Sequence, residues 1–91
     1  MLLATASLMN QLDLDNIIQH VESRLELNGV TLRDDSHLHR SHLNFQAQKA
    51  YLTITLANHT SLSRIQFHKQ VYQLVEEACP IPIHALCIKL V

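Results

Sequence analysis

The sequence predicts a small α+β domain in which a helix, two strands, a second helix and a third strand follow one another, with the helices packed on a three-stranded sheet. Two segments repeat apolar residues with the 3.6-residue period of a helix. Three others show the alternation or the short apolar run that is typical of a strand. A chain of 91 residues has room for one such domain with a modest core and no deep cleft.

The first helix is expected to begin near Asp13 or Asp15, because either carboxylate can cap free backbone N–H groups, and to run to Leu27. Gly29 is the only glycine in the chain. It suits the left-handed position that ends a helix, which other residues adopt at a cost. The residues before the helix, 1–12, are predicted to be a flexible arm, and 13–91 the domain.

The two strands that follow differ in regularity. A short strand is expected from Val30 to Asp34, and a polar loop from Asp35 to Lys49. From Ala50 to Leu56, aliphatic side chains alternate with tyrosine and threonine. This alternation predicts a strand with one face buried and the other in water.

The second helix has a clear start and a clear end. Ser63 and Gln66 match the capping-box pattern, with Ser61 as an alternative cap. Apolar residues then recur with helical period as far as Ala78, and Pro80 stops the helix.

The last segment, Ile83 to Val91, has apolar residues at both parities and is predicted to be the central strand, covered on both faces. His84 has the parity of Leu86, which places it near an edge of the core. The ordinary interpretation is a histidine whose ring nitrogens bond to nearby backbone. A functional role for this imidazole is the alternative.

Composition excludes several classes of protein. The formal charge is −1, so no global basic field attracts nucleic acid, and no apolar run approaches the ~20 residues that a membrane helix needs. Cys79 and Cys87 form neither a CxxC pair nor a disulfide framework, and are expected to be buried free thiols in a reducing cytosol. Residues 1–12 lack the basic start of a secretory signal, and Met9 is an alternative first residue.

Histidine is unusually frequent, with seven residues, and three of them stand close together on the polar loop. His37, His39 and His42 have a spacing from which neutral imidazoles can converge on a zinc or iron ion. The alternative is that they are solvated. Without regularly spaced cysteine or carboxylate ligands a self-contained structural zinc site is not favoured, but the loop can supply one ligand to a shared site.

A basic strip on the second helix, formed by Arg64, His68 and Lys69, is the candidate surface for nucleic acid. Because no aromatic residues are interleaved with it, a solvated helix face is the favoured interpretation. The order of elements also resembles the KH family, whose nucleic-acid clamp is a GXXG loop. A chain whose sole glycine is Gly29 cannot contain that loop. Adjacent Ser-His pairs at 36–37 and 41–42 do not make a nucleophile and base, so an enzyme is not expected.

Three motifs together resemble the BolA family. The segment IHALCIK at 83–89 is similar to the family's VHALxIK strand, and SRIQFHK at 63–69 is similar to its SRxxRHRxV helix. The segment DDSHLHRSH at 34–42 resembles the DESHxHxxH loop of many bacterial members. The similarity covers roughly Asp13 to Val91.

This resemblance implies a class II KH-like topology and partnership with a monothiol glutaredoxin, the two proteins sharing a 2Fe-2S cluster. A glutaredoxin cysteine and a glutathione thiolate would hold one iron, and a strand histidine and a loop residue the other. His84 matches the strand ligand, and His39 best matches the loop ligand, with His37 and His42 able to substitute. Two neutral imidazoles would raise the reduction potential of the cluster and make it more labile, which suits iron sensing or cluster delivery.

The chain departs from the family pattern in its basic helix, where Phe67 and Lys69 replace the arginines that flank His68. It also has Lys49-Ala50-Tyr51 where the second strand usually starts with SHF or THF, and His59-Thr60-Ser61 in place of an FxG turn. The first hypothesis is therefore a non-enzymatic, cytoplasmic adaptor for a glutaredoxin. The alternatives are a DNA-binding transcriptional regulator of stress response and cell morphology, and a fold kept for protein contact without metal; self-association stays open.

Overall fold

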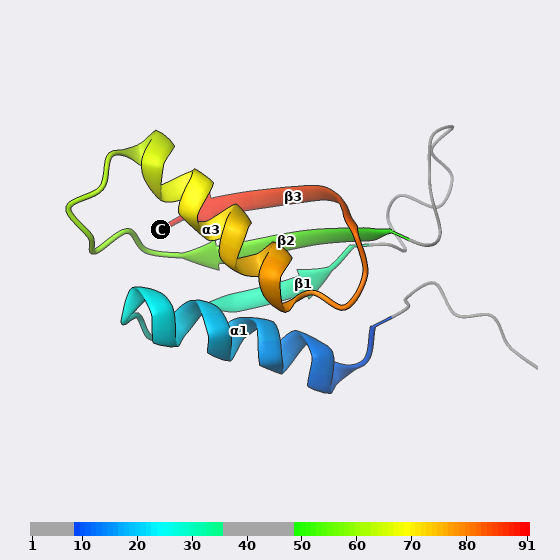
Figure 1. The fold of residues 1–91 in the computed structure, drawn as a ribbon. Coiled ribbons are helices and arrows are strands. Elements are labelled where there is room, and N and C mark those ends of the chain that lie inside the picture. Colours follow the sequence, from blue (N-terminus) through cyan, green and yellow to red (C-terminus); the bar gives the residue numbers. More distant parts are fainter. Residues whose placement is uncertain (1–8, 36–48) are drawn as a thin grey trace, which may run out of the picture.

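The predicted order of elements is confirmed in the computed structural model, which describes residues 9–35 and 49–91 (Figure 1). Both helices lie on the same face of a three-stranded sheet. The elements are α1 (Gln11–Leu25), β1 (Thr31–Asp34), β2 (Ala50–Leu56), α3 (Arg64–Ala78) and β3 (Ile83–Leu90).

Helix α1 starts and ends earlier than the sequence pattern predicted. Asn10 is its N-cap, and its side chain accepts from the Asp13 backbone N–H at 2.9 Å, while the Asp13 carboxylate accepts from the Asn10 N–H at 3.1 Å. Asp13 is therefore part of a capping box inside the helix rather than its first residue. At the other end Glu26 adopts the left-handed conformation, with φ 55°. Gly29 also has a positive φ, 73°, but it lies in the turn beyond the helix.

Helix α3 begins as predicted, with Ser63 as its N-cap and a reciprocal capping box to Gln66. Cys79 caps its C-terminus and contacts the sulfur of Met9 at 3.7 Å. Because Met9 is buried and Gln11 is helical, the chain joins the folded unit earlier than residue 13.

The sheet has the order β1-β2-β3, so the prediction that β3 is central was wrong. β2 is the central strand, antiparallel to β1 and parallel to β3. Apolar residues at both odd and even positions of β3 suggested a doubly covered strand. A one-residue shift in the pairing with β2 explains why Ile83 packs against the core together with Leu86, Ile88 and Leu90. The helices cover one face of the sheet, and no described element covers the other.

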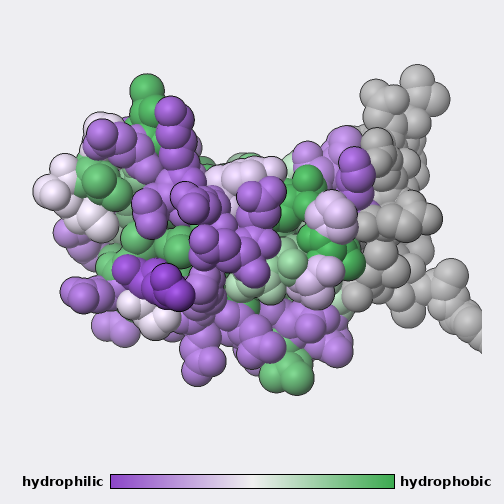
Figure 2. Space-filling view, viewed as in Figure 1, coloured by the Kyte–Doolittle hydropathy of each residue, from purple (hydrophilic) through white to green (hydrophobic). Residues whose placement is uncertain are grey.

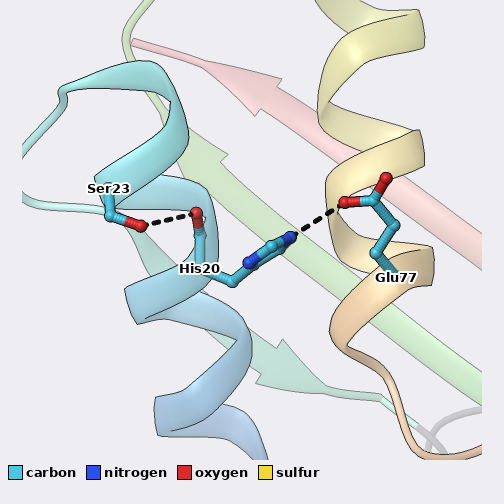
Figure 3. Close-up of polar contacts among 3 residues, drawn as sticks. All are labelled: His20, Ser23 and Glu77. Atoms are coloured by element: carbon cyan, nitrogen blue, oxygen red, sulfur yellow. Dashed lines mark hydrogen bonds and ion pairs between the residues drawn. The ribbon is translucent and has the colours of Figure 1, made fainter.

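The core lies between the helices and the sheet. Ile17 and Val21 of α1, Phe67 and Val71 of α3, and Ile54 of β2 are completely buried. Hydrophilic side chains cover most of the outer surface of the two helices (Figure 2). A polar contact joins the helices at their rim, where the His20 Nε2 atom lies 2.9 Å from Glu77 Oε1 and the Ser23 hydroxyl donates to the His20 carbonyl at 3.2 Å (Figure 3).

Candidate functional site

The pairing between β2 and β3 shifts by one residue at the start of β3. Ile83 is the partner of Ala50, whereas the next residue of β2, Tyr51, is the partner of Ala85. His84 is therefore the extra residue of a β-bulge. Bulges bend a strand and redirect a side chain, and here the bulge breaks the alternation on which the predicted position of His84 depended.

His84 is exposed, whereas Leu86 packs against the core, so the predicted common side for the two residues was wrong. The His84 ring instead lies against Tyr51, with ring centroids 4.9 Å apart and planes inclined by 38°. Tyr51 alternates along β2 with Ala50 and Leu52, which belong to the core under the helices. The Tyr51–His84 contact therefore lies on the face of the sheet that no described helix covers.

Among the residues that the structure describes, no hydrogen bond to the His84 ring is found. The ordinary interpretation, a histidine satisfied by neighbouring backbone, thus lacks support there. An exposed neutral imidazole with a nitrogen lone pair is a good ligand for a transition metal. Contact with the Tyr51 ring, which is only 3% exposed, restricts the motion of the imidazole.

A buried carboxylate ties β1 to β2 on the same face. Asp35 is the first residue of the predicted polar loop, but it is only 5% exposed. It accepts hydrogen bonds from the Thr53 hydroxyl and from the Arg33 Nε atom, the latter at 2.5 Å. The hydrogen bond that Arg33 donates to Asp35, and then the negative charge of Asp35, raise the pKa of Arg33 above its usual value. β2 accordingly has two buried residues, Tyr51 and Thr53, on the face predicted to be wet.

Asp35, the last described residue before segment 36–48, lies next to this site. The Asp35 backbone N–H donates to the Tyr51 carbonyl at 2.6 Å, so Asp35 and His84 both contact Tyr51. His37, His39 and His42 lie outside the described residues. His37 follows Asp35 by two residues, and two residues span at most about 7 Å. Sequence reasoning missed Tyr51 as the residue that both His84 and Asp35 contact, because only strand register reveals these contacts.

A model of the BolA-like protein family matches residues 21–91. The chain belongs to the BolA-like protein family. The matched region begins within α1 and includes β3 with His84. The searches of curated proteins and of solved structures gave no match.

The basic strip of this BolA-like protein is only partly available to a ligand. Arg64 and Lys69 are exposed, but His68 is half-buried, and its Nε2 atom is buried without a hydrogen-bond partner. That nitrogen cannot contact a phosphate in this conformation. Two acidic residues, Glu76 and Glu77, lie further along the same helix. The structure adds no further basic residue to α3, and the DNA-binding role stays a prediction.

The two thiols occupy different environments. Cys79 is half-buried, and its burial raises the pKa of its thiol. Cys87 is exposed, so the prediction of two buried thiols was wrong for this residue. Within residues 9–35 and 49–91, no three histidine, cysteine or acidic side chains are grouped as metal ligands. The same residues contain no helix long and apolar enough to cross a membrane.

Proposed function

We propose that this BolA-like protein is a non-enzymatic adaptor that pairs with a monothiol glutaredoxin and shares a 2Fe-2S cluster with it. His84 would be one ligand and a loop histidine, His39 in the first instance, the other. Glutaredoxin and glutathione thiolates would hold the second iron. The complex would serve iron sensing or cluster delivery, and we infer a cytoplasmic location because glutathione keeps thiols reduced there.

The observation that carries the proposal is the position of His84. Its imidazole is exposed at a bulge, and it contacts the same tyrosine to which the start of the histidine-bearing loop is hydrogen-bonded. A ligand on β3 and ligands that follow Asp35 thus originate at the same end of the sheet.

The available donors fit a shared cluster better than a resident one. A 2Fe-2S cluster needs four ligands, and the described residues hold no group of three donors. Imidazoles from this chain can complete a site whose thiolates come from the partner. When bound, the cluster would supply one-electron chemistry and iron; the residues of this chain would orient it and set its lability.

The test is anaerobic cluster reconstitution with a monothiol glutaredoxin and glutathione, followed by visible absorption and circular dichroism. Wild-type protein is expected to change the spectrum of the glutaredoxin cluster, and His84→Ala to abolish that change. His59→Ala is the matched control, because His59 is an exposed histidine outside the site. His37→Ala, His39→Ala and His42→Ala, tested singly, identify the loop ligand. A wild-type protein that leaves the spectrum unchanged would falsify the proposal.

A further inference from the structure

Among the described residues, no strand pairs with the outer edge of β3. The Val91 N–H donates to the Leu56 carbonyl in β2 at 3.1 Å. The odd-numbered residues of β3 from Ala85 onward therefore direct their N–H and C=O groups toward β2. Residues of the other parity, Leu86, Ile88 and Leu90, direct their N–H and C=O groups away from the sheet. Within the described part of the chain, β3 pairs with β2 alone.

This edge carries few of the features that usually prevent strand pairing. Natural edge strands are commonly shortened or interrupted by proline or charge. β3 has eight residues, the nearest proline precedes it at Pro82, and Lys89 is its one permanently charged residue. Its bulge lies at the start of the strand, at His84, and the regular stretch from Ala85 onward contains no bulge.

Apolar burial is also incomplete along this edge. Leu86, Ile88 and Leu90 pack against the core but stay half-buried, whereas their partners Leu52, Ile54 and Leu56 in β2 are at most 2% exposed. Further apolar area would be removed from water if another strand continued the sheet here.

We propose that the edge of β3 pairs with the same edge of a second copy of this chain, antiparallel and with Cys87 on the two-fold axis. This register pairs the whole regular stretch from Ala85 to Lys89. Leu86 faces Ile88 of the second copy, and their outward N–H and C=O groups bond to each other. Ala85 faces Lys89 of the second copy, so no two like charges are opposed.

The second copy is favoured over an unrelated peptide because the edge is complementary to itself. Antiparallel pairing in this register keeps Leu86 and Ile88 of both copies on the helix side and Cys87 on the other. A two-fold interface uses the same residues twice, as most homodimers do. The proposal does not depend on the glutaredoxin role, because it involves neither His84 nor a metal.

The register makes a specific prediction for thiol cross-linking. Cys87 and its counterpart would form a non-hydrogen-bonded pair, with Cα atoms roughly 4.5 Å apart, which is within the range for a disulfide. Diamide would accept two electrons and two protons as the two thiols form the bond. A covalent dimer is expected from the wild type and Cys79→Ser, and none from Cys87→Ser. Ala85→Cys in the Cys87→Ser background is the register control and should give no covalent dimer, because residue 85 faces Lys89 of the second copy.

Equilibrium sedimentation without oxidant tests the pairing itself. Cys87→Lys and Cys87→Glu should each weaken self-association about tenfold through like charges placed face to face, and an equimolar mixture should restore it. Cys87 is exposed, so both variants should keep the wild-type circular dichroism spectrum. A wild type that sediments as a monomer at every concentration, or an Ala85→Cys cross-link as efficient as that through Cys87, would overturn the proposal. Association unaffected by either charge would point to another surface and overturn it as well.

Discussion

The side chain of His68 in α3 lowers the stability of the folded state. Its Nε2 atom is buried and has no hydrogen-bond partner in the described structure. Leaving a buried polar atom unsatisfied costs roughly 1–3 kcal/mol. His68→Leu is therefore expected to raise the free energy of unfolding by about 1 kcal/mol, as measured by urea denaturation.

His68→Gln is the control for this prediction, because glutamine keeps a polar group of similar reach. It should give no increase in stability. Equal destabilisation by leucine and glutamine would show that the imidazole makes a stabilising contact.

The two cysteines should differ in their rate of alkylation. Cys87 is exposed, whereas Cys79 is half-buried beside Met9. Burial raises the pKa of Cys79, so at a given pH less of it is the reactive thiolate. Iodoacetamide followed by mass spectrometry should modify Cys87 first. In Cys87→Ser, the alkylation rate of Cys79 should keep rising above pH 9, beyond the ordinary thiol range.

Comparison with Cys79→Ser gives the rate of Cys87 alone. If the two single variants react at equal rates across this pH range, the half-buried position of Cys79 does not protect it.

At the scale of elements, α1 ends at Glu26, a residue type for which the observed backbone conformation is unfavourable. Glu26 has φ 55° and ψ 48°, and a residue other than glycine pays roughly 1–2 kcal/mol for this left-handed geometry. Glu26→Gly is expected to raise the free energy of unfolding by about 0.5–1 kcal/mol in a denaturant titration, after the entropy of the unfolded glycine is counted.

Gly29→Ala is the opposite change. Its φ is 73°, and an added Cβ would meet no atom within 4 Å, so only backbone strain opposes it. A loss of about 1 kcal/mol is expected. Stabilisation by Gly29→Ala, or no gain from Glu26→Gly, would contradict this account of the turn.

Local sequence signals predicted most of the elements but not their irregularities. The alternation in Ala50–Leu56 and the Ser63 capping box gave β2 and the start of α3 correctly, since each depends on neighbours in the chain. The side of the sheet on which His84 lies was predicted wrongly. A bulge is a property of two strands pairing, and the sequence of β3 alone does not contain it.

At the scale of the whole molecule, the helix layer is joined at its rim by one polar contact over a shared apolar core. His20 and Glu77 are 57 residues apart in sequence, and their side chains are 24% and 45% exposed. Pairs this exposed contribute little, so a double-mutant cycle with His20→Ala and Glu77→Ala is expected to give a coupling below about 1 kcal/mol.

Ile17→Ala in the core beneath is the comparison, with an expected loss of roughly 2–5 kcal/mol because that side chain is fully buried. If the coupling energy of His20 and Glu77 exceeds the stability loss of Ile17→Ala, the polar contact at the rim, rather than the core, holds the helices together. Both quantities come from the same urea titrations.

The order of elements along the chain predicted that helices pack on a sheet, but not which strand is central or which residue contacts His84. Tyr51, Asp35 and Thr53 come together through the register of β1 on β2, a relation between residues 16 to 18 positions apart. The resemblance to a family gave the candidate ligands His84, His37, His39 and His42. Only pairing geometry brought the start of the loop and the strand histidine to the same tyrosine.

The hydrogen bond from Asp35 to Tyr51 has a consequence for how this protein can vary. It holds Asp35, at the end of β1, against Tyr51, near the start of β2, so the described residues on either side of segment 36–48 have a fixed separation. Doubling the length of such a connection costs only about 0.6 kcal/mol in closure entropy. A change in the length of this connection, for example to add cysteine, carboxylate or more histidines, therefore alters the closure entropy of the chain by only a fraction of a kcal/mol for a few residues, about 0.3.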